Sequence, residues 1–139
     1  MILSDNDLRL YISRGLLKIE PLSNDTVREN GVDLRLAEYE ICDGYALGLT
    51  VEYIAVPRNL VGFCNLRSTL ARMGLFIPPT IIDAGFEGKI VVEILGRIDL
   101  LERVVGKRFL HVVFAETKSP STGYRGQYQG QRDIIIGEI

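Results

Sequence analysis

The stretch IIDAGFEGKIVVEIL, residues 81–95, carries the clearest signals for the fold. Its first half holds Gly85 and Gly88 on either side of an aromatic residue, which is typical of a tight turn. Its second half reads as a strand, and period-two spacing divides the residues between two faces, Ile90, Val92 and Ile94 on one and Val91, Glu93 and Leu95 on the other. The stretch therefore predicts a β-hairpin in which one carboxylate, Glu93, stands among apolar neighbours.

Short strand-like runs recur along the rest of the chain, at 32–36, 47–51, 61–66 and 109–115. Many short runs separated by turn residues favour an all-β sandwich or barrel. Two helices interrupt the pattern. Residues 4–16 predict a short N-terminal helix that Ser4 can cap, with Asp7 three residues later and Gly15 near its end. A second helical turn is expected from Ser68 to Gly74.

The bulk composition describes one globular domain of 139 residues, 47% hydrophobic and 24% charged. No apolar run could span a bilayer, and the N-terminus lacks a signal pattern, so we expect a cytoplasmic protein without a membrane partner. Two cysteines and one histidine, His111, cannot form a zinc site from clustered motifs. His111 is expected on a core strand. A net charge of −2 does not favour nucleic acid as a partner.

Positive charge is concentrated in two segments that contain no acidic residue. Residues 53–82 contain three arginines, and residues 117–132 contain Lys118, Arg125 and Arg132. Such segments suggest a local site for a small polyanion, although ordinary charge fluctuation explains them equally well. The second segment lies in SPSTGYRGQYQGQRD, residues 119–133, which is poor in aliphatic residues. It is either a frayed end or a flap that closes over a ligand.

Three motifs could carry chemistry, and each has a plain structural alternative. In LRSTLARMGL, residues 66–75, the amides of a helix start together with Arg67, Ser68 and Thr69 suit a phosphate group, or form only a helix cap. The turn could hold a sugar hydroxyl through Asp83 and shield it with Phe86, or be only a turn. Glu93, between apolar neighbours, could have a raised pKa and move protons, or be solvated or paired with a lysine.

The tyrosines, arginines and glutamines of the C-terminal segment could stack on or clamp a nucleotide. Single-stranded RNA is a weaker alternative, because only one short stretch interleaves basic and aromatic residues.

In this order, VDLRL, LTVEYIAVP, LRSTLARMGL, IDAGFEGKIVVEI and GYRGQYQGQR resemble the dCTP deaminase branch of the dUTPase-like superfamily, and the archaeal enzymes in particular. The resemblance covers nearly the whole chain. It implies a mainly β, distorted barrel or jelly-roll-like domain over residues 1–139, closed by a C-terminal segment over residues 117–139. It also implies a homotrimer with active sites between subunits, and Mg²⁺ bound through the triphosphate, with no metal ligands from the protein.

Site residues follow from the same resemblance. Arg67, Ser68 and Thr69 match the stretch that is implied in triphosphate binding. Arg72 matches the arginine that closes this motif, which is implied to lie near the reacting nucleobase. Asp83 matches the residue that contacts the deoxyribose, and Phe86 the aromatic behind it. Glu93 matches the general base, which would activate a water poised near Ser68. The residues implied in the closing segment are Tyr124, Gln127, Tyr128 and Gln131.

The resemblance leaves three functions open. The first is deamination of dCTP to dUTP, with or without further hydrolysis to dUMP and diphosphate. The second is a dUTP diphosphatase in which Glu93 is idle, and the third is a trimeric, non-catalytic nucleotide-binding barrel. Pro78-Pro79 replaces the usual Thr-Ala, Gln127 replaces a common lysine, and the segments 36–47 and 67–83 are short. A compact enzyme and a relative that has lost deamination are both consistent with these departures.

Overall fold

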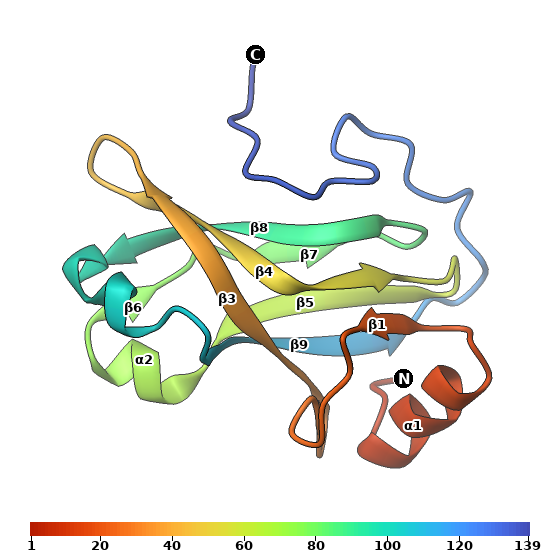
Figure 1. Ribbon diagram of the computed structural model, residues 1–139. Coiled ribbons are helices and arrows are strands. Elements are labelled where there is room, and N and C mark those ends of the chain that lie inside the picture. The colour runs from red at the N-terminus through yellow and green to blue at the C-terminus, as the bar shows by residue number, and fades with distance from the viewer.

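The computed structural model describes residues 1–139, and strands dominate it (Figure 1). The strands are β1 (Lys18–Glu20), β2 (Val27–Arg28), β3 (Gly31–Ile41), β4 (Ala46–Ala55), β5 (Leu60–Leu66), β6 (Leu75–Phe76), β7 (Thr80–Ile82), β8 (Glu87–Gly96) and β9 (Arg108–Glu116). The helices are α1 (Asp5–Ser13), α2 (Ser68–Arg72) and a 3₁₀ helix, η1 (Ile98–Arg103). None of the helices has the length and hydropathy needed to cross a bilayer.

Both predicted helices are present and shorter than expected. Ser4 caps α1 through a capping box, in which its backbone N–H donates to Asp7 Oδ2 at 2.9 Å. α1 ends at Ser13, and its C-cap Arg14 is followed by Gly15, whose φ of +70° an L side chain rarely adopts. η1 and the short strands β1, β2 and β6 were not predicted.

The strands form one curled sheet in the order β6-β8-β4-β3-β9-β5-β7, with β1 added to β4 and β2 to β3. The curl arises at β3, which pairs with β9 from Val32 to Arg35 and with β4 from Leu36 to Ile41. Register shifts mark this exchange of partners, as expected where a strand turns a corner between two layers. Figure 1 shows β3 crossing obliquely between the two layers.

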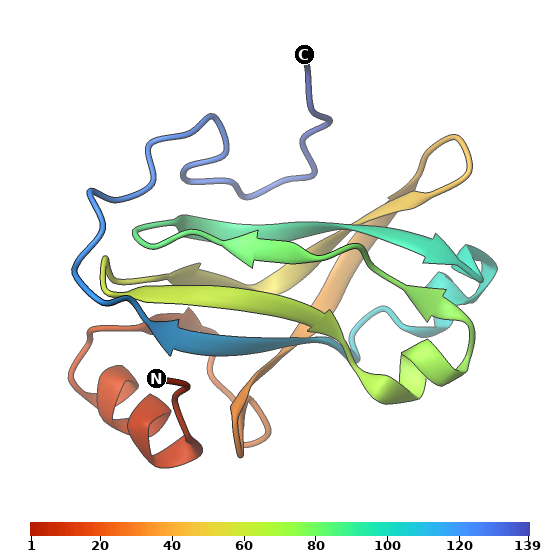
Figure 2. The ribbon, with the colours of Figure 1, turned by 180° about the vertical axis from the view of Figure 1, so that it is seen from behind.

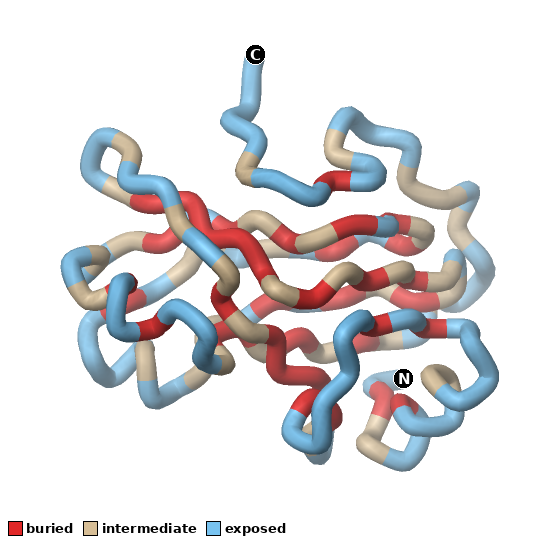
Figure 3. The backbone as a smooth tube through the Cα atoms, in the orientation of Figure 1, coloured by how far each residue is buried: buried red, intermediate tan, exposed pale blue.

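One hydrophobic core fills the space between the layers (Figure 3). Its largest fully buried residues include Phe109 and Phe114 of β9, Leu34 and Leu36 of β3, and Ile94 of β8. On β8 the buried residues alternate as predicted, with Ile90, Val92 and Ile94 facing the core. The predicted mainly β, distorted-barrel fold is confirmed.

The predicted hairpin is wrong in one respect that matters for function. A turn does join β7 to β8, closed by the Phe86 N–H donating to the Asp83 carbonyl at 3.1 Å. The two strands, however, do not pair with each other, because β7 pairs with β5 while β8 pairs with β4 and β6. The sheet is therefore not closed by a ladder along this seam, where β7 and β8 run side by side (Figure 2).

The C-terminal segment (residues 117–139) runs back over the β7–β8 turn (Figures 1 and 2). Gln131 forms a parallel bridge with Gly88, and the Lys89 N–H donates to the Gln131 carbonyl at 2.7 Å. Only glycine permits this close approach, because a Cβ on Gly88 would lie 2.8 Å from the backbone nitrogen of Gln131, which is too close. A Cβ on Gly85 would similarly lie 2.9 Å from the Gly123 Cα.

Candidate functional site

A cavity of about 480 Å³ lies along the open seam between β7 and β8. Thr80, Ile81 and Ile82 line it from β7, and Ile90, Val91 and Glu93 line it from β8. Because the two strands share no ladder, backbone groups on the facing edges remain available to a ligand. The cavity is mostly apolar with a few polar groups, which is typical of a small-molecule site.

Six of the predicted site residues line this one cavity: Asp83, Phe86, Glu93, Tyr124, Tyr128 and Gln131. They come from the turn, from β8 and from the C-terminal segment, and the outermost two, Asp83 and Gln131, are 48 positions apart in sequence. The spacing of residues within any one motif could not have predicted that these six side chains lie around one cavity.

Aromatic rings form one wall of the cavity. The ring of Phe86 is buried and meets the ring of Tyr124 edge to face, with centroids 5.5 Å apart. Asp83, next to them in the turn, is exposed, so its carboxylate is free to contact a polar group of a ligand. The geometry suits a ring or sugar held between an apolar wall and a carboxylate.

Glu93 lies on the cavity face of β8, opposite Leu47 in the ladder with β4. Leu47 and Val91 also line the cavity, so the predicted apolar neighbours are present. The carboxylate itself is exposed. In a single chain it is therefore accessible both to a ligand in the cavity and to water.

The C-terminal segment is docked by its glutamines. The Gln129 side chain accepts from the Glu87 N–H at 2.8 Å and donates to the carbonyls of Gly85 and Tyr124. The side-chain amide of Gln131, which is buried, donates to the Lys89 carbonyl at 2.9 Å. Gln131 thus holds the segment in place as well as lining the cavity. Gln127 is exposed and does not line it.

The remaining predicted residues lie elsewhere. Ser68, Thr69 and Arg72 are exposed on α2, and Arg67 immediately precedes it. None of these four lines the cavity. Within one chain, the residues predicted to bind phosphate therefore lie apart from Glu93, the predicted general base.

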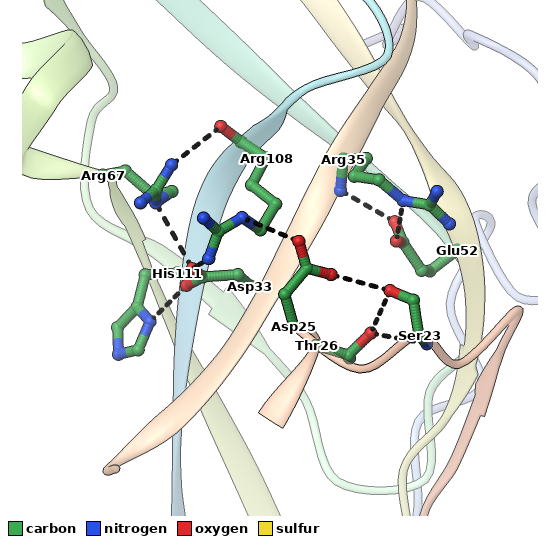
Figure 4. A network of polar contacts seen from close by, with 9 residues as sticks. All are labelled: Ser23, Asp25, Thr26, Asp33, Arg35, Glu52, Arg67, Arg108 and His111. Carbon is green, nitrogen blue, oxygen red and sulfur yellow. Dashed lines mark hydrogen bonds and ion pairs between the residues drawn. The ribbon is translucent and has the colours of Figure 1, made fainter. Parts of the chain in front are cut away.

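Arg67 belongs to a polar network centred on Asp33 (Figure 4). The buried carboxylate of Asp33 meets Arg67 Nε at 3.3 Å, Arg108 Nη1 at 3.0 Å and His111 Nδ1 at 2.8 Å. These three nitrogen donors offset the free-energy cost of burying the carboxylate. The network also fixes the guanidinium of Arg67 in front of α2.

Asp25 extends this network at the protein surface, where it meets Arg108 Nε at 3.3 Å. A hydrogen bond from the Ser23 hydroxyl, helped by the charge of Arg108, holds the pKa of Asp25 below its usual value against an opposing effect of burial. Arg108 is thus shared between two carboxylates, whereas Arg67 pairs with one carboxylate and donates to the Arg108 carbonyl.

Sequence reasoning missed Asp33, Arg108, Gln129 and Tyr45, the last of which lines the cavity. Asp33 alternates with apolar residues in VDLRL and so looks solvent-facing; its partners come from β9 and from the start of α2. A signal existed only for Gln129, which lies in the glutamine-rich motif. No group of three or more His, Cys, Asp or Glu side chains could hold a metal ion, and both cysteines are free.

Comparison with known proteins gives consistent results. The profile of the family described as dCTP deaminase-like matches residues 42–117. A dCTP deaminase of Hyperthermus butylicus is 43% identical, over 96% of this chain and 97% of that protein. A probable deoxyuridine 5'-triphosphate nucleotidohydrolase of Sulfolobus islandicus rod-shaped virus 1 is 44% identical, over 99% of both chains.

Solved structures share the fold at lower identity. The 2'-deoxycytidine 5'-triphosphate deaminase of Agrobacterium tumefaciens superposes with a TM-score of 0.67 at 21% identity, over 84% of this chain and 48% of that one. The dUTPase of Staphylococcus bacteriophage 80alpha superposes with a TM-score of 0.55 at 17% identity, over 82% of this chain and 98% of that one.

Proposed function

The chain belongs to the dCTP deaminase-like family, and from this premise we propose that it is a dCTP deaminase, which converts dCTP and water to dUTP and ammonia. The observation that carries the proposal is the position of Glu93. It shares one cavity with Asp83 and Phe86, so a carboxylate able to act as a base lies beside groups suited to a nucleoside. Relatives named dCTP deaminase, at 43% and 44% identity, support the same assignment.

Each group has a role in this proposal. The cytosine lies in the seam, where the unpaired edges of β7 and β8 offer backbone donors and acceptors to its ring. Asp83 contacts the deoxyribose, and Phe86 with Tyr124 forms the apolar wall behind it. Tyr128 and Gln131 close the cavity from the C-terminal segment, and Gln127 reaches the phosphates from its rim.

Glu93 acts as the general base. It takes a proton from a water held near Ser68, and the hydroxide attacks C4 of cytosine to form a tetrahedral intermediate. Glu93 then returns the proton to the amino group, the C4–N4 bond breaks, and ammonia leaves. Arg72, which lies near the cytosine, stabilises the negative charge that develops in the tetrahedral intermediate.

We place the phosphate end of the site on a neighbouring subunit. Arg67, Ser68 and Thr69 would bind the triphosphate, yet they lie outside the cavity of their own chain. A homotrimer with cyclic symmetry could bring α2 of one copy to the cavity of the next at all three sites. Exposed apolar residues Phe63, Ile81 and Phe76 support such an association, and Phe63 and Ile81 are ladder partners on one face of the sheet.

The remaining parts of the proposal concern the surroundings of the reaction. Mg²⁺ enters as part of the Mg–triphosphate substrate, and the carboxylate base takes the place that zinc-bound hydroxide has in other deaminases. The free cysteines fit a reducing cytoplasm.

A second candidate is a dUTP diphosphatase, which cleaves dUTP to dUMP and diphosphate. The viral relative with that name, at 44% identity, favours it. The two activities can also occur in sequence in one site, in which case dCTP yields dUMP, ammonia and diphosphate.

The test is an incubation of the purified protein with Mg²⁺ and dCTP, and in parallel with dUTP, while ammonia, diphosphate and nucleotides are measured together. Ammonia with accumulating dUTP identifies a deaminase, and ammonia with dUMP and diphosphate identifies the coupled enzyme. Diphosphate from dUTP without ammonia from dCTP would replace the first candidate by the second. Nucleotide binding without any turnover would leave only a binding protein.

A further inference from the structure

Tyr45 lines the same cavity as Glu93, although no motif pointed to it. It ends the turn between β3 and β4, where the Cys42 N–H donates to the Tyr45 carbonyl at 2.8 Å. Two residues later, Leu47 stands opposite Glu93 in the β4–β8 ladder. Alternation along the strand gives Tyr45 and Leu47 the same face, so Tyr45 is the diagonal neighbour of Glu93.

A diagonal pair across an antiparallel ladder lies within reach of a long aromatic side chain. The phenol is half-buried, and its hydroxyl lies beside the Cys42 side chain, whose sulfur is only a weak hydrogen-bond partner. This contrasts with the tyrosines whose hydroxyls are engaged, such as Tyr53, which donates to Glu87 Oε2 at 2.9 Å, and Tyr11, which accepts from Asn59. The Tyr45 hydroxyl is thus available to a group in the cavity.

The electrostatic surroundings agree with this placement. The pKa of the Tyr45 phenol is raised, first by a hydrogen bond with the Cys42 side chain and by its charge, then by desolvation, and then by the negative charges of Glu93 and Asp43. A phenol with a raised pKa stays protonated at neutral pH and acts as a hydrogen-bond donor. The carboxylate on its own face of the sheet, diagonal to it across the ladder, is that of Glu93.

We propose that Tyr45 is a positioning residue for deamination, whose hydroxyl donates to the Glu93 carboxylate and orients it toward the attacking water. This inference rests on the proposed function and extends it to a residue outside the recognised motifs. One oxygen of Glu93 is held by the phenol, and the other is left to take the proton.

The test is Tyr45→Phe, which keeps the ring and removes only the hydroxyl, with Tyr39→Phe on β3 as the matched control outside the cavity. We expect kcat for ammonia release to fall by about tenfold, while the Kd for dCTP changes little. Tyr39→Phe should change neither quantity.

The other titratable groups that face this region are unchanged in the variant: Asp83, Tyr124 and Tyr128 around the cavity, and Cys42 and Asp43 in the turn. Cys42→Ala gives a second measurement, since it removes the other neighbour of the hydroxyl. It should leave kcat for ammonia release unchanged or raise it, and a fall in kcat as large as that of Tyr45→Phe would contradict the proposal.

Wild-type kcat in a folded Tyr45→Phe protein would overturn the role of Tyr45 and leave the proposed function intact. Absence of ammonia release from the wild-type protein would overturn both. A lower melting temperature with unchanged kinetics would show Tyr45 to be structural only, which also rejects the proposal.

Discussion

Glu93 shows how one residue in an alternating strand acquires a separate role. Its neighbours Val92 and Ile94 face the core, whereas Glu93 points into the cavity beside Leu47 and Val91. On an ordinary solvent face, a carboxylate at this position could be replaced without consequence. In the seam it is the carboxylate on β8 that stands beside the proposed position of the cytosine.

Glu93→Gln tests this role, because the amide keeps the size and polarity of the side chain and cannot accept a proton. We expect ammonia release to stop while dCTP still binds, as measured by an ammonia assay and by titration calorimetry. Glu40→Gln on β3, an exposed glutamate outside the cavity, is the control. Unchanged deamination by the Glu93 variant would reject Glu93 as the base.

Arg67 is the second residue whose role can be isolated. Arg67→Ala removes a charge-assisted contact, so the Kd for dCTP should rise by about tenfold or more, while the Kd for deoxycytidine should change little. Asp33 keeps Arg108 and His111 as partners in this variant, which limits the damage to the fold. Arg9→Ala on α1 serves as the control. An equal loss for the two ligands would place Arg67 away from the phosphates.

The elements around the seam depend on a few polar contacts. The β4–β8 ladder is interrupted between Leu49 and Tyr53, and Thr50 bridges the gap. Its buried hydroxyl accepts from the Ile90 N–H at 2.9 Å and donates to the Glu52 carbonyl at 2.8 Å. Thr50 therefore holds β8 in place three residues before Glu93.

Thr50→Val keeps the shape of the side chain and leaves a buried N–H and a buried carbonyl without their partner. We expect the free energy of unfolding to fall by about 1–3 kcal/mol, measured by urea denaturation at matched protein concentration. Thr122→Val, at an exposed position, is the control and should have little effect. If both variants unfold at the same urea concentration as the wild type, Thr50 does not stabilise this part of the sheet.

The C-terminal segment is the element most directly tied to turnover. Deleting residues 124–139 removes the Tyr124 ring from Phe86 and the glutamine contacts with the turn, and so opens the cavity to water. We expect a lower kcat for ammonia release from a protein whose circular dichroism spectrum still shows the β fold. Full activity in the truncated protein would mean that the segment does not close the site.

Alternation predicted the long strands well, because β3, β4, β5, β8 and β9 each bury every second residue over part of their length. It could not predict β2 or β6, which have two residues each and no period. It also suggested, wrongly, that β7 and β8 pair. Alternation within a strand does not identify the strand's partners, which are set by the curl of the whole sheet. Asp33 was missed for the same reason, since its cations come from distant parts of the chain.

At the scale of the whole molecule, the two halves of the proposed site lie on different parts of one chain. The cavity holds Glu93, Asp83 and Phe86, while Arg67 and α2 lie outside it. Exposed Phe63 and Ile81 offer a surface for a second copy. A trimer with shared sites explains both observations, and sedimentation analysis of the purified protein would give its mass directly.

Subunit complementation between Glu93→Gln and Arg67→Ala tests the central claim most directly. At a dCTP concentration well below the Kd of the Arg67 variant, each variant alone should release little ammonia, whereas co-expressed chains should form mixed trimers in the proposed assembly. A site built from an intact Glu93 on one copy and an intact Arg67 on the next should arise in about a quarter of cases on random mixing. We predict recovery of ammonia release toward that fraction of wild-type activity. Mixed trimers that remain as inactive as the separate variants would contradict a deamination site shared between subunits.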